Sequence, residues 1–360
     1  MTVALPDELW LRVFQLGHFS LRQALYVRAV CCKWRDLCKL LVVEGDHPED
    51  DVVLQTIPSI GGVLDFPGPA MFGGLKVLTV TVLPNVRIRP FGINANKLET
   101  IDVFFAAPPQ NDSWSLADIR SIFRSCVNLK TCRLLGMNIN KSSQAEPVLT
   151  PPRLTVLRLM AASRAGTFQW SLNKWQGLHT LTALSLSNWN GRSAVWQDTL
   201  QNMAVLKQFS VSNCPRFDNG ACRVLFERCL RLEYVNISDT LGIVSPVIIL
   251  AGAGNLKNLQ FLRLERDGHL LSAVPISNFH LSLMSGTNAS GSPLFPALTK
   301  LMLRGYRVCP ANLMEFATKL ALLRTLGIDY NLVLLDGLKK CFRAKRPDVR
   351  ITAYINAVDI

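Results

Sequence analysis

One hydrophobic pattern recurs along most of the chain: an apolar residue, two variable residues, an apolar residue, one variable residue and another apolar residue. The alternation at the end of each copy predicts a short strand with one face in a core. A single copy cannot bury its apolar side alone, so consecutive copies must stack as a solenoid. Their mean spacing of about 28 residues suits such an array. The copies begin at Leu75, Leu98, Leu129, Leu154, Leu181, Leu206, Leu232, Leu259, Leu298 and Leu323.

The segments between these strands must return the chain to the start of the next copy, and the sequence predicts that they are helical. Apolar residues recur every three or four positions in residues 116–123 and again in residues 313–320, which is the spacing of one helix face. Residues 346–354 read as a last edge strand that caps the stack.

The N-terminal forty residues follow a different pattern. Leu5, Leu9, Val13 and Leu16 recur at helical spacing, and a second helical apolar stripe follows in residues 24–37. Two or three short helices are too few to build a large core. They are therefore expected either to dock on the rest of the chain or to present an apolar face to a partner.

These N-terminal residues resemble the F-box motif, through Leu5-Pro6-Asp7-Glu8-Leu9, Val13-Phe14 and Val30-Cys31-Cys32-Lys33-Trp34. The segment from residue 5 to residue 30 is about two residues longer than the commonest form, with the excess near residues 17–21. The resemblance implies binding to a Skp-type adaptor and, through it, to a cullin scaffold. The residues that would contact the adaptor or hold the box together are Leu5, Pro6, Leu9, Val13, Val30 and Trp34.

The ten copies of the hydrophobic pattern resemble leucine-rich repeats over residues 75–354, and residues 214–232 resemble the cysteine-containing subtype often found after F-boxes. Cys126 and Cys229 both stand three residues before the first leucine of a repeat, which implies a structural role. The expected fold is therefore α/β: an N-terminal helical F-box followed by a curved leucine-rich-repeat solenoid with parallel strands on its concave face.

The expected domains are an F-box at residues 1–43, an acidic linker at 44–51 and the repeat solenoid at 52–360. The linker holds five carboxylates in residues 44–51 and neither Lys nor Arg, as is common in solvated segments. Residues 266–297 contain an insertion, because 39 residues separate the repeats that begin at Leu259 and Leu298. Such an insertion is either a tolerated surface loop or a ligand contact.

Composition narrows the location and the chemistry. The chain has 56 leucines among 360 residues and a formal net charge of +13. The N-terminus lacks a basic segment followed by an apolar one, and no apolar run approaches the roughly 20 residues that span a bilayer. A cytoplasmic or nuclear protein with reduced cysteines is expected. No metal or other cofactor is expected, because no Cys-x-x-Cys pair occurs and the histidines lie far from any cysteine cluster.

Two groups of cations on the strand face are candidates for target binding. Residues third, fifth and seventh in each repeat are expected to face solvent there. Arg133 and Arg158 hold equivalent places in consecutive repeats and should be neighbours about 5 Å apart.

The second group comprises Arg263, Lys300 and Arg304 beside Tyr234 and Phe261. Arginine with aromatic residues is typical of interface hot spots, and an acidic or phosphorylated segment would suit them. The alternative is that both groups are ordinary solvated strand residues. The basic stretch 339–346 is read either as a nuclear-import or nucleic-acid patch or as the solvated end of a terminal helix.

No motif for catalysis is present: the chain lacks a Gly-x-Ser-x-Gly elbow, a His-Glu-x-x-His sequence and a phosphate-binding loop. The chain is therefore not expected to be an enzyme. The predicted function is that of a substrate-receptor subunit in an SCF-type cullin–RING ubiquitin ligase. The alternatives are a leucine-rich-repeat interaction scaffold without ligase activity and a basic nucleic-acid-binding protein. No membrane partner is expected.

Overall fold

The computed structural model describes fourteen segments of the chain. They are residues 53–54, 63–65, 76–82, 87–89, 97–105, 116–137, 147–161, 175–240, 246–265, 274–276, 294–304, 306–308, 310–329 and 332–354. The described elements divide near residue 180 into two compact units, called unit 1 and unit 2 below. The F-box and linker predicted for residues 1–51 lie outside the described residues.

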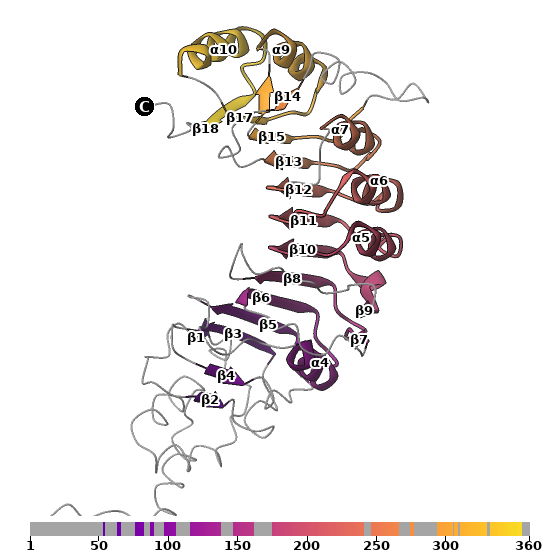
Figure 1. Ribbon diagram of the computed structural model, residues 1–360. Helices are drawn as coiled ribbons and strands as arrows, with labels where there is room; N and C mark the ends of the chain where they lie inside the picture. Colours follow the sequence, from indigo (N-terminus) through magenta and orange to yellow (C-terminus); the bar gives the residue numbers. More distant parts are fainter. Residues whose placement is uncertain are drawn as a thin grey trace, which may run out of the picture. The chain divides into compact units, whose positions relative to one another are not determined.

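Five parallel strands form the main sheet of unit 1 (Figure 1). In spatial order they are β1 (Val53–Leu54), β3 (Val77–Val82), β5 (Thr100–Phe105), β6 (Thr131–Met137) and β8 (Val156–Ala161). The last four begin two residues after a predicted repeat leucine, as expected. The first strand, β1, extends the sheet by one strand beyond the predicted array.

The connections in unit 1 are less helical than predicted. Helix α4 (Leu116–Ser125) confirms one expected return. The next two returns instead contain short strands, β7 (Val148–Leu149) and β9 (Trp175–Gln176), which pair in parallel and precede a 3-10 turn, η4 (Leu178–Thr180). A second such pair joins β2 (Val63–Asp65) to β4 (Arg87–Arg89).

Prolines and a close backbone approach explain the extended returns. Pro147, Pro151 and Pro152 flank β7, and a proline disfavours both a helix interior and a helical residue before it. On the neighbouring return, Gly177 has a φ of +91° and a Cβ there would lie 2.3 Å from the Thr150 Oγ1. The hydroxyl of Thr150 instead donates a hydrogen bond to the Gln176 carbonyl at 2.8 Å.

Seven parallel strands form the main sheet of unit 2. In spatial order they are β10 (Ala183–Ser187), β11 (Gln208–Ser212), β12 (Tyr234–Ser238), β13 (Phe261–Glu265), β15 (Lys300–Arg304), β17 (Thr325–Asp329) and β18 (Arg350–Tyr354). The first six begin two residues after a predicted leucine, and β18 confirms the expected edge strand.

Helices form the second layer of unit 2 (Figure 1). Helices α5 (Ser193–Leu200), α6 (Asn219–Arg228) and α7 (Pro246–Gly254) lie along one side of the strands, and α9 (Pro310–Lys319) and α10 (Leu332–Lys345) follow. Asp218 caps α6 by accepting a hydrogen bond from the Ala221 N–H at 2.9 Å. Within the predicted insertion, β14 (Val274–Ile276) pairs with β16 (Tyr306–Val308).

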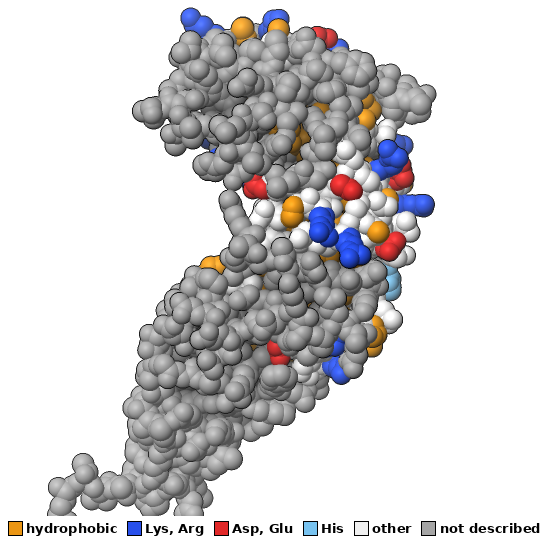
Figure 2. All heavy atoms as spheres, in the orientation of Figure 1, with side chains coloured by type: hydrophobic (Ala, Val, Ile, Leu, Met, Phe, Trp, Pro, Cys, Tyr) orange, Lys and Arg blue, Asp and Glu red, His pale blue; other side chains and the backbone are white. Residues whose placement is uncertain are grey.

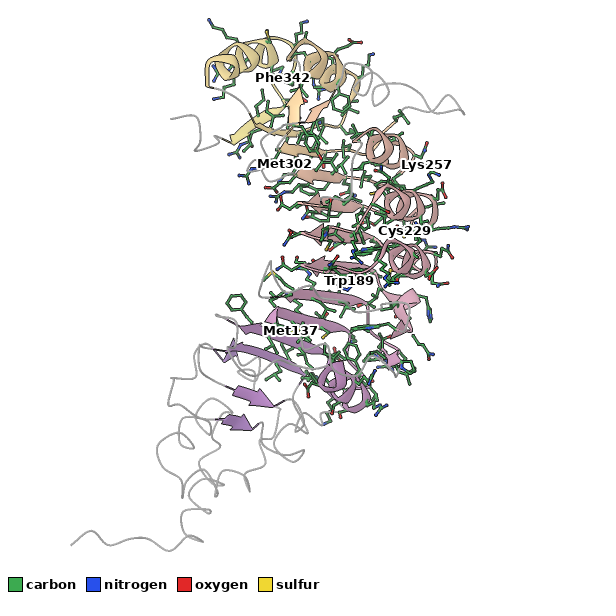
Figure 3. The ribbon with its side chains drawn as sticks, viewed as in Figure 1. Met137, Trp189, Cys229, Lys257, Met302 and Phe342 are labelled. Atoms are coloured by element: carbon green, nitrogen blue, oxygen red, sulfur yellow. The ribbon has the colours of Figure 1, made fainter. Side chains whose placement is uncertain are left out.

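Alternation along each strand places the repeat leucines in the core. In β8, Leu157 and Leu159 are buried while Arg158 and Met160 are partly exposed. The same alternation holds in β12, where Val235 and Ile237 face inward. Side chains of the strands and helices fill the space between the two layers (Figure 3). Phe342, on the inner side of α10, is an example of a fully buried side chain. The outward residues form what is called here the open face of each unit.

An aromatic cluster anchors the first repeats of unit 2. Trp196 on α5 is fully buried, and its ring lies edge-on to Trp189 at 4.2 Å and to Phe217 at 4.8 Å between centroids. A Cβ at Gly191 would lie 2.2 Å from the Trp189 ring. Glycine at this position therefore lets the indole fold back against the chain.

Three consecutive strands of unit 2 end in the same turn. Asn188, Asn213 and Asp239 follow β10, β11 and β12, with φ angles of 60°, 50° and 53°. Asn and Asp tolerate this left-handed region better than other residues. Each donates its N–H to the carbonyl of the last residue of the following strand, at distances of 2.9, 3.0 and 2.8 Å. The chain thus leaves each strand in the same direction. Among the described helices, none is long and apolar enough to cross a membrane.

Candidate functional site

The register of unit 2 aligns equivalent repeat positions into rows that cross the strands on the open face. Gln208, Tyr234, Phe261, Lys300 and Thr325 are successive partners in one row. Parallel strands lie about 4.8 Å apart, so neighbouring side chains in a row can touch. This row contains three of the predicted target-binding residues.

Tyr234 and Phe261 form an aromatic pair in the centre of that row. Their rings are stacked face to face, with centroids 4.4 Å apart and planes inclined by 2°. The Lys300 ammonium lies 5.1 Å from the centroid of the Phe261 ring, within the range of a cation–π contact. The structure therefore brings these three residues together as the sequence predicted, and this trio is called the ledge below.

A carboxylate joins the other two predicted cations. Glu265, at the end of β13, accepts a hydrogen bond from the Arg304 guanidinium at 2.6 Å and forms an ion pair with Arg263 on its own strand. Only 10% of the Glu265 side chain is exposed, against 36% and 42% for the two arginines. Counted over the described residues, the site holds three cations with Lys300 and one carboxylate, which leaves two positive charges.

The side chains next to the ledge, on β11 and β12, are small and polar. The Asn236 amide donates to the Ser210 hydroxyl at 3.1 Å and accepts from the Ser238 hydroxyl at 2.7 Å. The ledge therefore borders a polar surface on β11 and β12.

In unit 1, Arg133 and Arg158 are register partners on β6 and β8, as predicted from their repeat positions. Arg133 also forms a 3.3 Å ion pair with Asp102 on the next strand, β5. Figure 2 shows the same mixture on the described surface, where Lys and Arg side chains alternate with Asp and Glu. The two arginines are thus neighbours, and one of them is partly neutralised.

Several sequence expectations meet different outcomes. The six predicted adaptor-binding residues lie outside the described residues. Met302 occupies an outward repeat position on β15 but is only 5% exposed, so its prediction as a solvent-facing residue is wrong. The sequence placed Glu265 and Asp102 on the strand face without pairing them with arginines. These ion pairs could have been predicted, because each carboxylate lies on the same strand as its arginine or on the adjacent strand.

Five described cysteines are buried and form no disulfide bond: Cys126, Cys132, Cys214, Cys222 and Cys229. Burial raises the pKa of the Cys214 and Cys229 thiols to about 12. Thiols with such pKa values stay protonated and unreactive at neutral pH. Cys214 also donates a long contact to the Leu186 carbonyl at 3.6 Å. The structure therefore assigns these cysteines to the core, whereas Cys341 is exposed.

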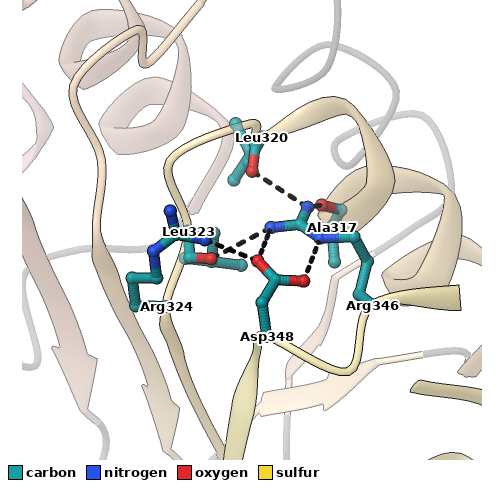
Figure 4. A network of polar contacts seen from close by, with 6 residues as sticks. All are labelled: Ala317, Leu320, Leu323, Arg324, Arg346 and Asp348. Atoms are coloured by element: carbon teal, nitrogen blue, oxygen red, sulfur yellow. Dashed lines mark hydrogen bonds and ion pairs between the residues drawn. The ribbon is translucent and has the colours of Figure 1, made fainter. Parts of the chain in front are cut away.

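The basic stretch 339–346 belongs to the end of α10, which supports its reading as a helix terminus, but Arg346 is not solvated. Its side chain is 13% exposed. Its guanidinium donates to the carbonyl oxygens of Ala317 at 2.5 Å, in the last turn of α9, and of Leu320 at 3.1 Å and Leu323 at 3.0 Å, after that turn (Figure 4). Carbonyls at a helix C-terminus lack intrahelical partners, so Arg346 caps α9 from a distant position in the same chain.

The described residues offer nothing that resembles a metal centre: no three His, Cys, Asp or Glu side chains among them come together as ligands. The chemistry on the open faces is that of aromatic, guanidinium, ammonium and carboxylate groups. Such groups bind peptides and charged side chains.

No family model and no curated protein matches the chain. Among solved structures, a leucine-rich-repeat protein of Leptospira interrogans is similar to 92% of this chain and 98% of its own, with 14% sequence identity and a TM-score of 0.33. The leucine-rich-repeat architecture of the described residues rests on their own geometry: leucine-led parallel strands in register, joined by outer helices or short strands.

Proposed function

We propose that the chain is a substrate receptor for an SCF-type ubiquitin ligase. In this proposal residues 5–37 bind a Skp-type adaptor, and the open face of unit 2 binds a target protein. The chain itself is not an enzyme. Its contribution to catalysis would be to hold a target lysine near a ubiquitin-loaded enzyme. It would act in the cytoplasm or the nucleus, where such ligases assemble.

The single observation that carries target binding is the ledge of Tyr234, Phe261 and Lys300. Stacked aromatic rings give a large contact area with little conformational entropy left to lose, which is the property of interface hot spots. The rings lie 4.4 Å apart with a cation beside them. An interface centred here would gain more per residue than one centred on the serine-rich strands.

The charges around the ledge favour an acidic or phosphorylated target segment. Glu265 holds Arg263 and Arg304 in place, and a preorganised guanidinium loses less entropy on binding a carboxylate or phosphate. Because two positive charges remain after pairing, an anionic segment would be attracted and a basic one repelled.

The resemblance of residues 5–37 to the F-box supports adaptor binding. The first experiment is a pull-down of a purified Skp-type adaptor by the full chain. Wild type should retain the adaptor, and a variant with Leu5→Ala and Pro6→Ala should lose it. The matched control is Tyr234→Ala with Phe261→Ala, which should retain the adaptor. A wild-type chain that captures no adaptor would refute the ligase proposal.

The second experiment tests the target site. Target proteins should co-purify with wild type but not with the Tyr234→Ala, Phe261→Ala variant. When the chain is depleted from cells, the lifetime of these proteins should increase. Loss of a hot-spot aromatic typically weakens binding by about 2 kcal/mol, or roughly 30-fold. Partners with unchanged lifetimes would favour the interaction scaffold without ligase activity.

The nucleic-acid alternative has less support from the described charges. Many of the cations are paired with carboxylates across neighbouring repeats, as in Lys130–Glu99 at 2.7 Å and Lys207–Glu233 at 2.8 Å. A phosphate backbone would have to displace these partners. Affinity for duplex DNA that fell steeply with salt concentration would revive this alternative.

A further inference from the structure

Unit 1 carries an exposed apolar row on its open face, separate from the ledge. Phe104, Leu135 and Met160 are successive register partners on β5, β6 and β8. Phe104 is 43% exposed and the other two are partly exposed. Among the described strands of the main sheets, Phe104 is the most exposed large apolar residue. Exposure of such a row to water is unfavourable, so the row is suited to binding a partner protein.

A charged row runs beside the apolar one. Asp102, Arg133 and Arg158 stand two residues earlier on the same three strands, which puts the two rows about 7 Å apart on the same face. Asp102 and Arg133 form an ion pair. Among the described residues, the Arg158 guanidinium makes no ion pair or hydrogen bond. The charged row therefore ends in one cation that is available to a ligand.

The spacing of the apolar row selects the shape of the occupant. Three side chains on adjacent strands span about 10 Å from first to last. Positions i, i+4 and i+7 of an α-helix span about 10.5 Å. Alternate residues of an extended peptide would need about 13 Å for three side chains. A helix that crosses the strands therefore matches the row.

A backbone irregularity lies at the same place. Directly after Leu135, Gly136 has a φ of +80°, and the register of β6 against β8 shifts between Leu135 and Met137. A β-bulge turns the local strand and re-aims the adjacent side chain. The bulge therefore interrupts the ladder immediately after the residue at the centre of the apolar row.

We propose that this surface of unit 1, Phe104, Leu135 and Met160 with Arg158, docks an amphipathic helix of a partner protein. The apolar stripe of the helix lies on the row, and a glutamate or aspartate beside the stripe pairs with Arg158. This proposal stands on unit 1 alone and does not depend on adaptor binding or on the ledge.

The test is a selection from a displayed library of random 16-residue peptides on the immobilised full chain. The library is depleted beforehand on a variant with Phe104→Ser and Met160→Ser. Both positions are solvent-accessible, so this variant is expected to fold, and its melting temperature verifies that it does. Enriched peptides should carry apolar residues at i, i+4 and i+7 with an acidic residue beside them. They should bind wild type at least tenfold more tightly than the variant in fluorescence anisotropy.

Charge exchange tests the role of Arg158. Arg158→Glu should weaken the selected peptides at least tenfold, and replacing the acidic residue of the peptide with lysine should restore most of the loss. The matched control, Tyr234→Ser with Phe261→Ser in unit 2, should leave peptide binding unchanged. The proposal is overturned if enriched peptides bind the Phe104→Ser, Met160→Ser variant equally, if no peptide distinguishes the two proteins, or if the enriched sequences are basic or lack helical spacing.

Discussion

The carboxylate of Asp348 accepts two parallel hydrogen bonds from the guanidinium of Arg346, at 2.9 Å from both Nε and Nη2. The same guanidinium donates to carbonyl oxygens in and after the last turn of α9. One residue therefore joins α9, the end of α10 and the turn into the edge strand β18. The final repeats are held together by a polar clamp as well as by leucines.

Removal of the clamp should destabilise unit 2. Arg346→Ala removes the donor to several carbonyl groups and one of the two arginines that bind Asp348, and a hydrogen bond to a charged group contributes about 1.5–3 kcal/mol. We expect a loss of about 2–3 kcal/mol in the free energy of unfolding, measured by urea denaturation. Arg343→Ala, at an exposed position in the same helix turn, is the control and should cost less than about 0.5 kcal/mol. Equal effects of the two substitutions would contradict the clamp.

The clamp should also make stability depend on pH. The Arg346 guanidinium, with smaller contributions from a backbone N–H and from Arg324, lowers the pKa of Asp348 from its ordinary 3.8 to about 2. A carboxyl group whose pKa is lower in the folded chain stabilises the fold above its ordinary pKa, and this contribution is lost as the pH falls toward about 2. The difference in urea midpoint between wild type and Asp348→Asn should therefore be largest at pH 5–7 and should shrink between pH 4 and pH 2. A difference that stays constant over this range would disprove the assignment.

Glu265 should contribute to stability as well as to the charge of the ledge. Glu265→Gln removes the charge of a nearly buried carboxylate that pairs with both Arg263 and Arg304, so we expect a loss of about 1–3 kcal/mol. Glu315→Gln is the matched control, because its i,i+4 pair with Lys319 at 2.9 Å is solvent-exposed. Such pairs contribute only about 0.3–0.5 kcal/mol. Thermal denaturation of both variants measures the contrast, and similar shifts would show that burial of Glu265 is unimportant.

Helices α6 and α7 approach each other closely at a glycine. A Cβ at Gly252 would lie 2.6 Å from the Phe226 ring and 3.1 Å from its Cβ. Gly252→Ala should therefore destabilise the fold by about 1–2 kcal/mol through overpacking, despite the higher helix propensity of alanine. Adding Phe226→Leu should recover part of the loss. Ala251→Ser, on the exposed side of α7, should change the melting temperature little. An increase in melting temperature for Gly252→Ala would contradict the predicted clash.

Cysteine reactivity should follow burial. In the folded chain, maleimide should label the exposed Cys341 within minutes while Cys214 and Cys229 stay unmodified, because burial raises the pKa of both thiols to about 12. Peptide mapping by mass spectrometry measures this difference, and labelling in guanidinium chloride provides the control in which all three react. Rapid modification of Cys214 in the native protein would place it outside the core.

Much of the fold followed from the sequence, because repeated leucines carry their register with them. Ten predicted strands each begin two residues after the leucine that marks them. Equivalent positions in consecutive repeats are necessarily neighbours in a parallel stack, so the pairing of Arg133 with Arg158 and of Tyr234 with Phe261 was predictable. The proposed adaptor contacts rest on the sequence alone, since residues 5–37 lie outside the described residues.

Other features depended on the tertiary structure. The choice of a strand over a helix in the returns at β7 and β9 depends on prolines and on the contact of Gly177 with Thr150. The charge that surrounds the ledge depends on side-chain rotamers. They bring Glu265 between Arg263 on its own strand and Arg304, which is 39 residues further along the chain. The sequence suggests that Arg346 is a solvated cation, but its side chain is only 13% exposed and caps α9, because α9 ends beside it. Periodicity determines which residues share a row, while the packing between elements determines which of them pair.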